Sequence, residues 1–253
     1  MSRNVSRRTM IKAGLSAVAG VGGLGAAVRL ADRYGLIPAN HHGIYGLSET
    51  LTYAAQRLLT TLPSMAREFD RSWISSVIPV NGKAPTTEAY QRLLAGGFAD
   101  WRITIDGMVA RPSSFSLAEL RSFPSRGHIT HQACEEGWSF IAEWTGVPLS
   151  YVLERVGVHP QAKYVFFFTF DKWWDSIDMA DALHPQTLLA YGMNGREMPT
   201  DHGAPLRLKV ARQLGYKNLK YLSRMTVTDS AKSIGDGLGS GSPADGYSWY
   251  AGI

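Results

Sequence analysis

The sequence predicts an α+β fold built from short strands and short helices. Apolar runs typical of strands recur between residues 101 and 227, and short helical segments separate them at irregular intervals. No internal repeat, P-loop or G-x-G-x-x-G pattern accompanies them. The hydrophobic content of 45% and the charged content of 19% are those of an ordinary globular domain. The irregular order of the elements favours mixed sheets with short helices over a doubly wound parallel sheet.

The N-terminal part of the chain is predicted to be separate from the main domain. We expect a leader over residues 1–30, a linker with a peripheral helix over 31–75, and the main domain over 76–253. The peripheral helix is predicted from apolar residues at helical spacing, namely Leu51, Ala54, Ala55, Leu58 and Leu59. A loop is predicted over residues 77–83, with its turn at Asn81-Gly82.

The helices of the main domain are predicted from their boundary signals. Ser116 and Glu119 form a capping box, which predicts a short helix that ends near Phe123-Pro124. Pro148 suits the first turn of a helix over residues 148–156. Two further short helices are predicted, at residues 86–95 and 177–183.

The strands are predicted from apolar patterning. Residues 101–109 alternate between apolar and polar and reach a turn at Asp106-Gly107, which indicates a half-buried strand. Residues 164–169 are apolar on both faces, which indicates a buried strand. Further strands are predicted at residues 128–133, 188–193, 206–210 and 219–227. Residues 233–246 are rich in Gly and Ser and are predicted to form a loop.

The net charge of +5 belongs to the N-terminal segment. Residues 1–30 hold five of the 26 basic residues and no acidic residue, so the remaining 21 basic residues balance the 21 acidic ones. A nucleic-acid-binding protein carries its basic residues on the folded domain. The sequence therefore argues against nucleic acid as a partner.

The N-terminal segment has the pattern of an export signal. The run SRRTMIK at residues 6–12 precedes a soft apolar stretch from Ala13 to Val28. This stretch falls short of the roughly 20 strongly apolar residues that a membrane-spanning helix needs. Paired arginines before such a stretch are typical of a twin-arginine signal. We therefore expect export of the folded protein to the periplasm, with a membrane tether if the leader is retained.

Cys134 is the single cysteine of the chain, so no internal disulfide can form. It lies in the segment HQACEEGWS at residues 131–139. One thiolate without a local pair of histidines does not make a zinc site. Two interpretations stay open from the residues alone: a buried packing residue, or a reactive thiol such as a hydrolase nucleophile with His131 or His202 as its base.

A second cluster of residues offers donors suited to a phosphate-bearing ligand. His202, Arg207 and Lys220 supply hydrogen bonds and positive charge. Gly203 and Gly215 permit a close approach of the backbone to a ligand. Each of these residues alone has an ordinary structural explanation. Only the sequence around them indicates whether they form a ligand-binding site.

Six sequence blocks lie between Cys134 and Arg224. They are C-x-E-G-W-S at 134–139, W-x-G-x-P-L at 144–149, K-Y-V-x-F-x-T at 163–169, A-L-H-P-Q-T at 182–187, N-G-x-x-x-P-x-x-H-G-A-P-L-R at 194–207 and G-Y-K-x-x-K at 215–220. In this order and spacing they resemble the molybdopterin-binding domain of the sulfite oxidase family. The similarity is greatest to compact bacterial members, among them the catalytic subunit of the periplasmic methionine-sulfoxide reductase. The resemblance implies a sulfite-oxidase-type fold, here without the immunoglobulin-like dimerisation domain.

The resemblance also implies a cofactor and the residues that hold it. The expected cofactor is Mo-molybdopterin, with one molybdenum per chain. Cys134 occupies the position whose thiolate binds the metal, and a soft thiolate suits such a metal. The positions at which the family holds the pterin and its phosphate are Asn81, Thr169, His202, Arg207, Asn218, Leu219 and Lys220.

Residues near the implied metal ligand are candidates for the substrate pocket. They are His131, Trp138 and Asp175 as catalytic residues, with Trp173 and Trp174 as further parts of the wall. Glu135 and Glu136 stand where better-known sulfite oxidases carry basic residues. Because carboxylates there repel sulfite, the resemblance does not extend to sulfite as the substrate.

The leading hypothesis is a molybdenum-dependent oxidoreductase that transfers an oxygen atom to or from a small molecule. The chain lacks the C-x-x-C-H motif of c-type haem, so we expect no haem and electron exchange with a separate protein, such as a membrane cytochrome. We expect a monomeric catalytic subunit. Two alternatives stay open: an exported cysteine hydrolase that uses Cys134 with His131 or His202, and a non-catalytic binding domain of the same fold.

Overall fold

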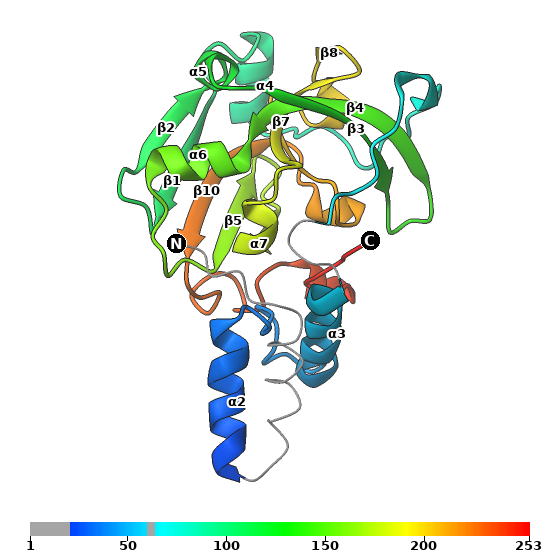
Figure 1. The fold of residues 1–253 in the computed structure, drawn as a ribbon. Coiled ribbons are helices and arrows are strands. Elements are labelled where there is room, and N and C mark those ends of the chain that lie inside the picture. Colours follow the sequence, from blue (N-terminus) through cyan, green and yellow to red (C-terminus); the bar gives the residue numbers. More distant parts are fainter. Residues whose placement is uncertain (1–20, 60–63) are drawn as a thin grey trace. The chain divides into compact units, whose positions relative to one another are not determined.

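The computed structural model describes residues 21–59 and 64–253 (Figure 1). The chain divides into two compact units, Met1–Ser64 and Met65–Ile253. The second unit begins before the predicted start of the main domain at residue 76, because residues 65–75 hydrogen-bond to strands of that unit. The backbone N–H of Phe69 donates to the carbonyl of Ile129, and the N–H of Ser75 donates to the carbonyl of Ile141.

The first unit contains two described helices, α2 (Val21–Arg33) and α3 (Gly46–Leu59). Helix α3 confirms the amphipathic helix that apolar spacing predicts. Helix α2 contains the last part of the predicted leader, and residues 1–20 of that leader lie outside the described residues. Over the ranges that the structure describes, no helix is long and apolar enough to cross a membrane.

The second unit is built from two β-sheets and short helices. Its elements in chain order are η2 (Arg71–Trp73), α4 (Glu88–Ala95), β1 (Arg102–Gly107), β2 (Ser113–Ser116), α5 (Leu117–Ser122), β3 (Arg126–Ala133), β4 (Ser139–Pro148), α6 (Leu149–Val156), β5 (Tyr164–Thr169), β6 (Trp174–Asp178), α7 (Met179–Ala182), β7 (Thr187–Met193), β8 (Arg196–Glu197), η3 (Thr200–His202), β9 (Arg207–Val210), η4 (Gly215–Lys217), β10 (Leu222–Thr228) and η5 (Ser242–Asp245). One sheet has the strand order β2-β1-β10-β5-β6. The other has the order β3-β4-β7-β8, with β9 also paired to β7. This architecture confirms the predicted α+β class.

The pairing of β1 with β10 joins the beginning of the main domain to its end. These two strands run parallel, with Thr104 opposite Arg224. The other pairs of named strands are antiparallel. Side chains from both sheets and from α6 fill the main core, and they include Ile103, Val152, Val165, Phe167, Leu189, Leu208 and Met225. Burial of this apolar face holds the two ends of the domain together.

Local sequence signals place several element boundaries correctly. The side chain of Ser116 accepts a hydrogen bond from the N–H of Glu119, and the carboxylate of Glu119 accepts one from the N–H of Ser116, so the predicted capping box is confirmed. The helix predicted at 148–156 is present as α6, but it begins at Leu149, because Pro148 ends strand β4 and is the N-cap residue. Helix α4 confirms the helix predicted near residues 86–95.

Some predicted boundaries are wrong, and some strands were not predicted. The helix predicted at 177–183 begins only at Met179, because residues before it belong to strand β6 and Asp178 caps α7 by accepting from the N–H of Asp181 at 2.8 Å. The strand predicted at 219–227 begins at Leu222, since Tyr221 has a φ of 58°, which interrupts an extended backbone. Strand β4 was not predicted, although its buried residues alternate with partly exposed ones.

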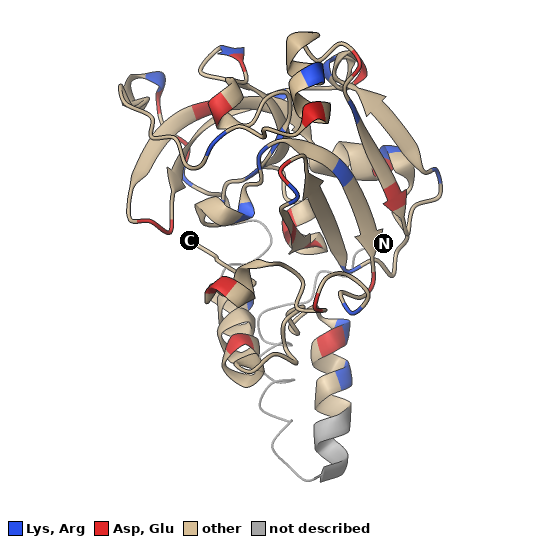
Figure 2. Cartoon of the chain, turned by 180° about the vertical axis from the view of Figure 1, so that it is seen from behind, with Lys and Arg blue, Asp and Glu red and all other residues tan. Residues whose placement is uncertain are grey.

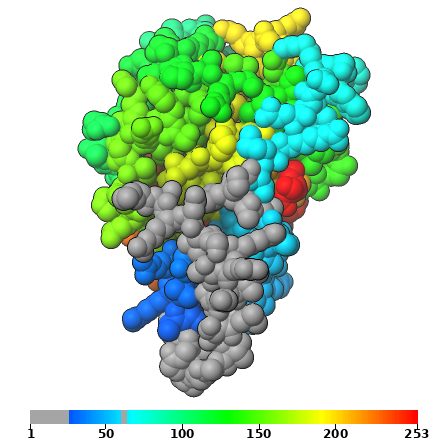
Figure 3. Space-filling model, in the orientation of Figure 1, coloured from blue at the N-terminus to red at the C-terminus, as the bar shows by residue number. Residues whose placement is uncertain are grey.

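The segment that opens the second unit covers the strands that lead to Cys134. Residues 65–80, in cyan, lie beside the green strands β3 and β4 on the surface of this unit (Figure 3). Gln186 fixes its first residues, because the side-chain amide exchanges hydrogen bonds with the backbone of Ala66 at 2.8 and 3.0 Å. The loop that carries Asn81 is therefore held on the same face as the end of β3.

Candidate functional site

A cavity of about 330 Å³ brings together segments that are far apart in the sequence. Its walls come from the loop before α4, the residues after β3, the end of β5, the start of β9, the residues after η4 and the C-terminal segment. Ten of the residues singled out in the sequence line it: Asn81, Cys134, Trp138, Thr169, Trp173, His202, Arg207, Asn218, Leu219 and Lys220. The structure therefore gathers most of the predicted site in one place.

Cys134 lies in a tight loop directly after β3. Its N–H donates to the carbonyl of Trp138 at 2.9 Å, and the N–H of Gly137, which has a φ of 90°, donates to its carbonyl at 3.1 Å. The side chain is 8% exposed, and Nδ2 of Asn81 lies 3.7 Å from its Sγ. Burial raises the pKa of the Cys134 thiol. Thiolate at this position therefore requires a positive partner, such as a metal ion.

Two carboxylates accompany the thiol. Oε2 of Glu135, which lines the cavity, lies 3.4 Å from Sγ of Cys134. Oε2 of Glu136 lies 3.9 Å from the same sulfur and accepts a hydrogen bond from Nε1 of Trp138 at 2.8 Å. The structure thus places negative charge beside the thiol, as the sequence predicts.

Arg207 is buried in the cavity wall without an acidic partner. Its side chain donates to the backbone carbonyls of His202 at 2.8 Å and Asn218 at 2.9 Å. Its Nε has no hydrogen-bond partner, and the whole residue is 4% exposed. The ring of Trp144 lies 4.9 Å from its guanidinium carbon. Desolvation by burial lowers the pKa of Arg207 to about 10.

Two lysines lie near this arginine. Nζ of Lys220 donates to the carbonyls of Asn81 at 2.5 Å and Asp201 at 2.8 Å, and burial together with Arg207 lowers the pKa of Lys220 to about 8. Lys209 is fully buried and donates to Oε1 of Gln132 at 2.7 Å. Burial, and then the charge of Arg207, lower the pKa of Lys209.

His202 completes the cluster on the cavity wall. Burial, then Arg207 and Lys220, lower its pKa to about 4, so the imidazole is neutral at neutral pH. Across residues 21–59 and 64–253, none of Arg207, Lys209 and Lys220 has a carboxylate within ion-pair distance. Elsewhere on the second unit, basic and acidic residues are interspersed (Figure 2).

This donor set fits an anionic ligand that carries a phosphate. Buried cations without counter-ions are unfavourable, because desolvation is not offset by attraction to an opposite charge. A phosphate at the free Nε of Arg207 and near Nζ of Lys220 supplies the missing charge through short, charge-assisted hydrogen bonds. The residues present therefore fit a pterin phosphate, with the Cys134 thiol available in the same cavity.

Thr169 and Asn218 use their side chains to hold the cavity wall. The hydroxyl of Thr169 donates to the carboxylate of Asp171 and to the carbonyl of Trp173. Oδ1 of Asn218 accepts from the N–H of Val210 at 2.7 Å, and its Nδ2 donates to the carbonyl of Leu214 at 2.8 Å. Direct contact of these two side chains with a cofactor remains a prediction.

Three of the predicted pocket residues do not line the cavity. His131 is exposed, whereas its neighbour Gln132 is buried and lines the cavity, because successive strand residues point to opposite faces. Asp175 is fully buried in an ion pair with Lys217. Trp174 stacks on Phe166, with ring centroids 6.0 Å apart. The prediction that His131, Asp175 and Trp174 form the pocket wall is therefore wrong.

Other residues line the cavity that were not predicted from the sequence. Gln132 had a usable signal, because it lies two positions before Cys134 on a predicted strand. Ser242, Asp245 and Tyr247 also line the cavity. They lie in or beside a segment that the sequence shows only as a Gly- and Ser-rich loop, so no local signal points to the site.

Several known proteins are similar to this chain in sequence. Residues 92–234, more than half of the chain, match the family described as the oxidoreductase molybdopterin binding domain. The chain is 39% identical over 154 residues to a putative protein-methionine-sulfoxide reductase subunit of Azospira oryzae, which covers 61% of this chain and 56% of that protein. It is 37% identical over 136 residues to the catalytic subunit of the protein-methionine-sulfoxide reductase of Xanthomonas axonopodis, which covers 47% of this chain and 42% of that protein. The chain spans about half the length of the curated relatives it matches.

A solved structure is also similar. The sulfane dehydrogenase SoxCD of Paracoccus pantotrophus aligns with 51% of this chain and 38% of its own chain, at 27% identity and a TM-score of 0.49. The family match contains Cys134 and the cluster of His202, Arg207 and Lys220. It confirms the resemblance seen in the sequence. The chain belongs to the family of oxidoreductase molybdopterin-binding domains.

Proposed function

We propose that this protein is a molybdopterin-dependent oxidoreductase in which Cys134 ligates the metal. One observation carries the proposal: a buried thiol shares a cavity with Arg207 and Lys220, two cations that lack acidic partners among the described residues. A thiolate suits a soft metal, and the cations suit the phosphate of the pterin. One cavity thus supplies both kinds of contact that the cofactor needs.

The chain's own residues hold and orient the group. Arg207 and Lys220 donate to the phosphate, and neutral His202 offers one donor and one acceptor to the pterin. Asn81 is held beside the thiol, because its carbonyl accepts from Lys220. The cofactor, when bound, supplies two-electron oxygen-atom transfer chemistry, while the protein provides binding, orientation and electrostatics.

We propose that the reaction is reduction of a sulfoxide to a thioether. The sulfur–oxygen bond breaks, the sulfur gains two electrons, and the oxygen takes up two protons and leaves as water. An electron-carrying protein supplies the two electrons. The names of the two relatives, both protein-methionine-sulfoxide reductase subunits, support this reaction. Glu135 also supports it, because its charge beside the thiol disfavours the anion sulfite.

We further propose that the protein is exported and works with a separate redox protein. The paired arginines at residues 6–12 support export to the periplasm by the twin-arginine route. The relatives are named subunits, which supports a partner protein such as a membrane cytochrome. In this arrangement the chain is a monomeric catalytic subunit.

The surroundings of Cys134 give little support to a cysteine hydrolase. The side chains within hydrogen-bond distance of its Sγ are Asn81, Glu135 and Glu136, and no described histidine forms a hydrogen bond with it. His131 is exposed outside the cavity. A nucleophilic cysteine needs an adjacent base or a lowered pKa, whereas burial raises the pKa of this thiol.

The test compares wild-type protein with Cys134→Ser, both purified from a host that makes molybdopterin. Bound molybdenum is measured by mass spectrometry, and reduction of methyl p-tolyl sulfoxide is followed by oxidation of reduced benzyl viologen. We expect stoichiometric molybdenum and turnover in the wild type, and loss of turnover in Cys134→Ser. Ser139→Ala, at the exposed first residue of β4 just after this loop, is the matched control. Wild-type protein without molybdenum contradicts the proposal.

A further inference from the structure

The C-terminal segment, residues 235–250, lies outside the family match yet forms part of the cavity wall. The match ends at residue 234, whereas Ser242, Asp245 and Tyr247 line the cavity. This part of the wall therefore lies beyond the residues that the family model matches. Its chemistry bears on which substrate reaches the site.

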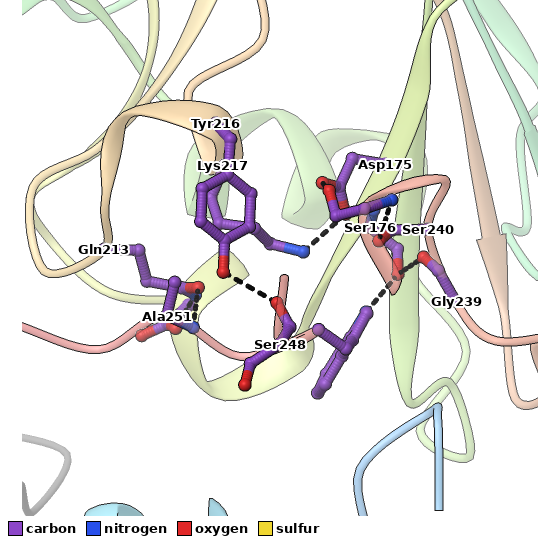
Figure 4. A network of polar contacts seen from close by, with 12 residues as sticks. Asp175, Ser176, Gln213, Tyr216, Lys217, Gly239, Ser240, Ser248 and Ala251 are labelled. Carbon is purple, nitrogen blue, oxygen red and sulfur yellow. Dashed lines mark hydrogen bonds and ion pairs between the residues drawn. The ribbon is translucent and has the colours of Figure 1, made fainter. Parts of the chain in front are cut away.

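A buried polar network fixes this segment to the core (Figure 4). Lys217 forms an ion pair with Asp175, whose other oxygen accepts from the hydroxyl of Ser242 at 3.2 Å. Both charged side chains are almost completely buried, with 1% and 0% of their surface exposed. Because breaking a buried ion pair is costly, this network holds Ser242 in one place.

Further bonds fix the two ends of the segment. The hydroxyl of Ser176 donates to the carbonyl of Gly239 at 2.5 Å and accepts from Nε1 of Trp249 at 2.9 Å. The hydroxyl of Tyr216 donates to the carbonyl of Ser248 at 2.7 Å (Figure 4). The segment is thus bonded on both sides of the residues that line the cavity.

Two glycines of the segment pack against tryptophan rings. A Cβ atom on Gly235 would lie 2.2 Å from the ring of Trp174, and one on Gly241 would lie 3.1 Å from the ring of Trp173. Side chains at these positions do not fit without displacement of the ring or the segment. The absence of side chains therefore allows the segment to lie directly on Trp173, at the cavity.

The segment completes an aromatic entrance. Trp173 and Tyr247 line the cavity and are also 39% and 42% exposed, so they lie where the cavity meets solvent. Tyr216 supports Tyr247, with ring centroids 5.2 Å apart. Aromatic surface of this kind binds apolar groups and is normally buried unless it serves an interaction.

The exposed charges at the entrance differ from those inside. Asp171 and Asp245 line the cavity and are exposed, and partly buried Glu135 lines it beside the thiol. Lys83 is the exposed lining cation in the described part of the chain. The entrance therefore has an excess of negative charge, whereas Arg207 lies buried inside. Such a field repels an anionic substrate but not an uncharged one.

We propose that Trp173 and Tyr247, with Asp245, are the specificity-determining residues of the entrance and select uncharged sulfoxides that carry an apolar group. This inference rests on the proposed function, since it names the substrate class of the same site. The aromatic rings bind the apolar group, and the carboxylates exclude anions. The C-terminal segment contributes Tyr247 and Asp245, so its position determines the selection.

The test uses molybdenum-loaded full-length protein with reduced benzyl viologen and two pairs of sulfoxides. Methyl p-tolyl sulfoxide and dimethyl sulfoxide differ in their apolar group, and methylsulfinylacetamide and methylsulfinylacetate differ in charge. For Tyr247→Ala we expect the kcat/KM ratio of the tolyl to the dimethyl substrate to fall about three- to tenfold, mainly through KM. For Asp245→Asn we expect the preference for the amide over the acetate to fall about two- to fivefold.

Matched variants separate specificity from folding. Tyr247→Phe keeps the ring and should restore the tolyl preference, whereas a general folding defect would not be selective between substrates. Trp73→Ala removes an aromatic side chain that is 57% exposed and does not line the cavity. Asp100→Asn removes an exposed carboxylate elsewhere. Both controls should leave the two ratios unchanged.

The outcomes distinguish this inference from the proposed function. Wild-type protein that holds molybdenum but reduces none of the four sulfoxides contradicts the proposed function itself. Wild-type protein that reduces all four without preference, or ratios that do not move in Tyr247→Ala and Asp245→Asn, overturns the inference alone. Selective loss in both variants, with rescue by Tyr247→Phe, supports it.

Discussion

The second unit buries two groups of basic side chains, and they differ in their partners. Beneath the C-terminal segment, Lys217 pairs with Asp175, and Arg212 lies 2.5 Å from Asp181. In the cavity wall, Arg207 is buried as deeply but donates only to backbone carbonyls. Paired charges of the first kind stabilise the fold, whereas an unpaired cation is kept for a charge that arrives with a ligand.

The pKa shifts follow the same division. Burial lowers the pKa of Lys217, but the carboxylate of Asp175 acts in the opposite direction. Burial lowers the pKa of Arg207 to about 10, with only Tyr221 acting against it. The paired side chains therefore have their counter-ions within the protein. The unpaired cation gains a counter-ion only when an anion binds. The predictions below test this difference.

The largest expected effect is on the paired group. Lys217→Met leaves the carboxylate of Asp175 buried without its counter-ion, and we expect the free energy of unfolding to fall by about 3–5 kcal/mol. Urea unfolding measures it. Lys232→Met, at an exposed position, is the control and should have little effect. A loss below about 1 kcal/mol would show that the pair does not anchor the C-terminal segment.

The unpaired group should make the cofactor-free protein sensitive to acid. The pKa of His202 is about 4 in the fold and 6.5 ordinarily, so between these values the unfolded chain binds a proton that the folded chain does not. Stability due to neutral His202 is therefore complete above pH 6.5 and is lost as the pH falls to about 4.

The difference between wild type and His202→Asn isolates this effect from other titrating groups. We expect the two unfolding free energies to diverge by about 2 kcal/mol between pH 7 and pH 4, after allowance for partial exposure of the imidazole. Bound cofactor should reduce the divergence, because a nearby phosphate favours the protonated imidazole. Parallel stability curves in the cofactor-free proteins would contradict the assigned environment of His202.

A substitution at Arg207 should affect cofactor retention more than folding. Arg207→Gln removes the unpaired charge, so we expect a small change in the stability of the cofactor-free protein. We expect cofactor affinity to fall about tenfold to a hundredfold, because a charge-assisted bond to phosphate is lost. Release of molybdenum from the purified holoprotein measures it. Arg121→Gln, an exposed arginine paired with Glu197, is the control. An unchanged rate of molybdenum release would contradict the assignment of Arg207 to the cofactor site.

The smallest expected effect concerns packing of the C-terminal segment. Gly235→Ala places a Cβ atom against the ring of Trp174, at a φ of 59°. Gly97→Ala has a similar φ of 60° but open space around the new atom. We expect Gly235→Ala to be less stable than this control by about 1–3 kcal/mol, the usual range for overpacking. Equal thermal stability of the two variants would argue against close packing on Trp174.

Much of the site follows from the sequence because its key residues lie in compact blocks. Cys134 is conspicuous as the single cysteine, and His202, Arg207 and Lys220 are close enough in sequence to be considered together. Helix boundaries such as the Ser116 capping box are also local, since residues three positions apart determine them. Periodicity and spacing depend on residues that are close in sequence. They therefore predict features that such residues determine, such as helix boundaries and compact motifs.

Tertiary structure alone decided which charges are paired and which remain available. Asp175 was expected in the pocket, but folding brings it to Lys217, 42 positions away along the chain. The same holds for the parallel pairing of β1 with β10, and for the path that brings Asp245 and Tyr247 to the cavity. The physical reason is that a charge removed from water needs a partner, and only the folded chain shows that Lys217 has one in Asp175 whereas Arg207 has none among the described residues.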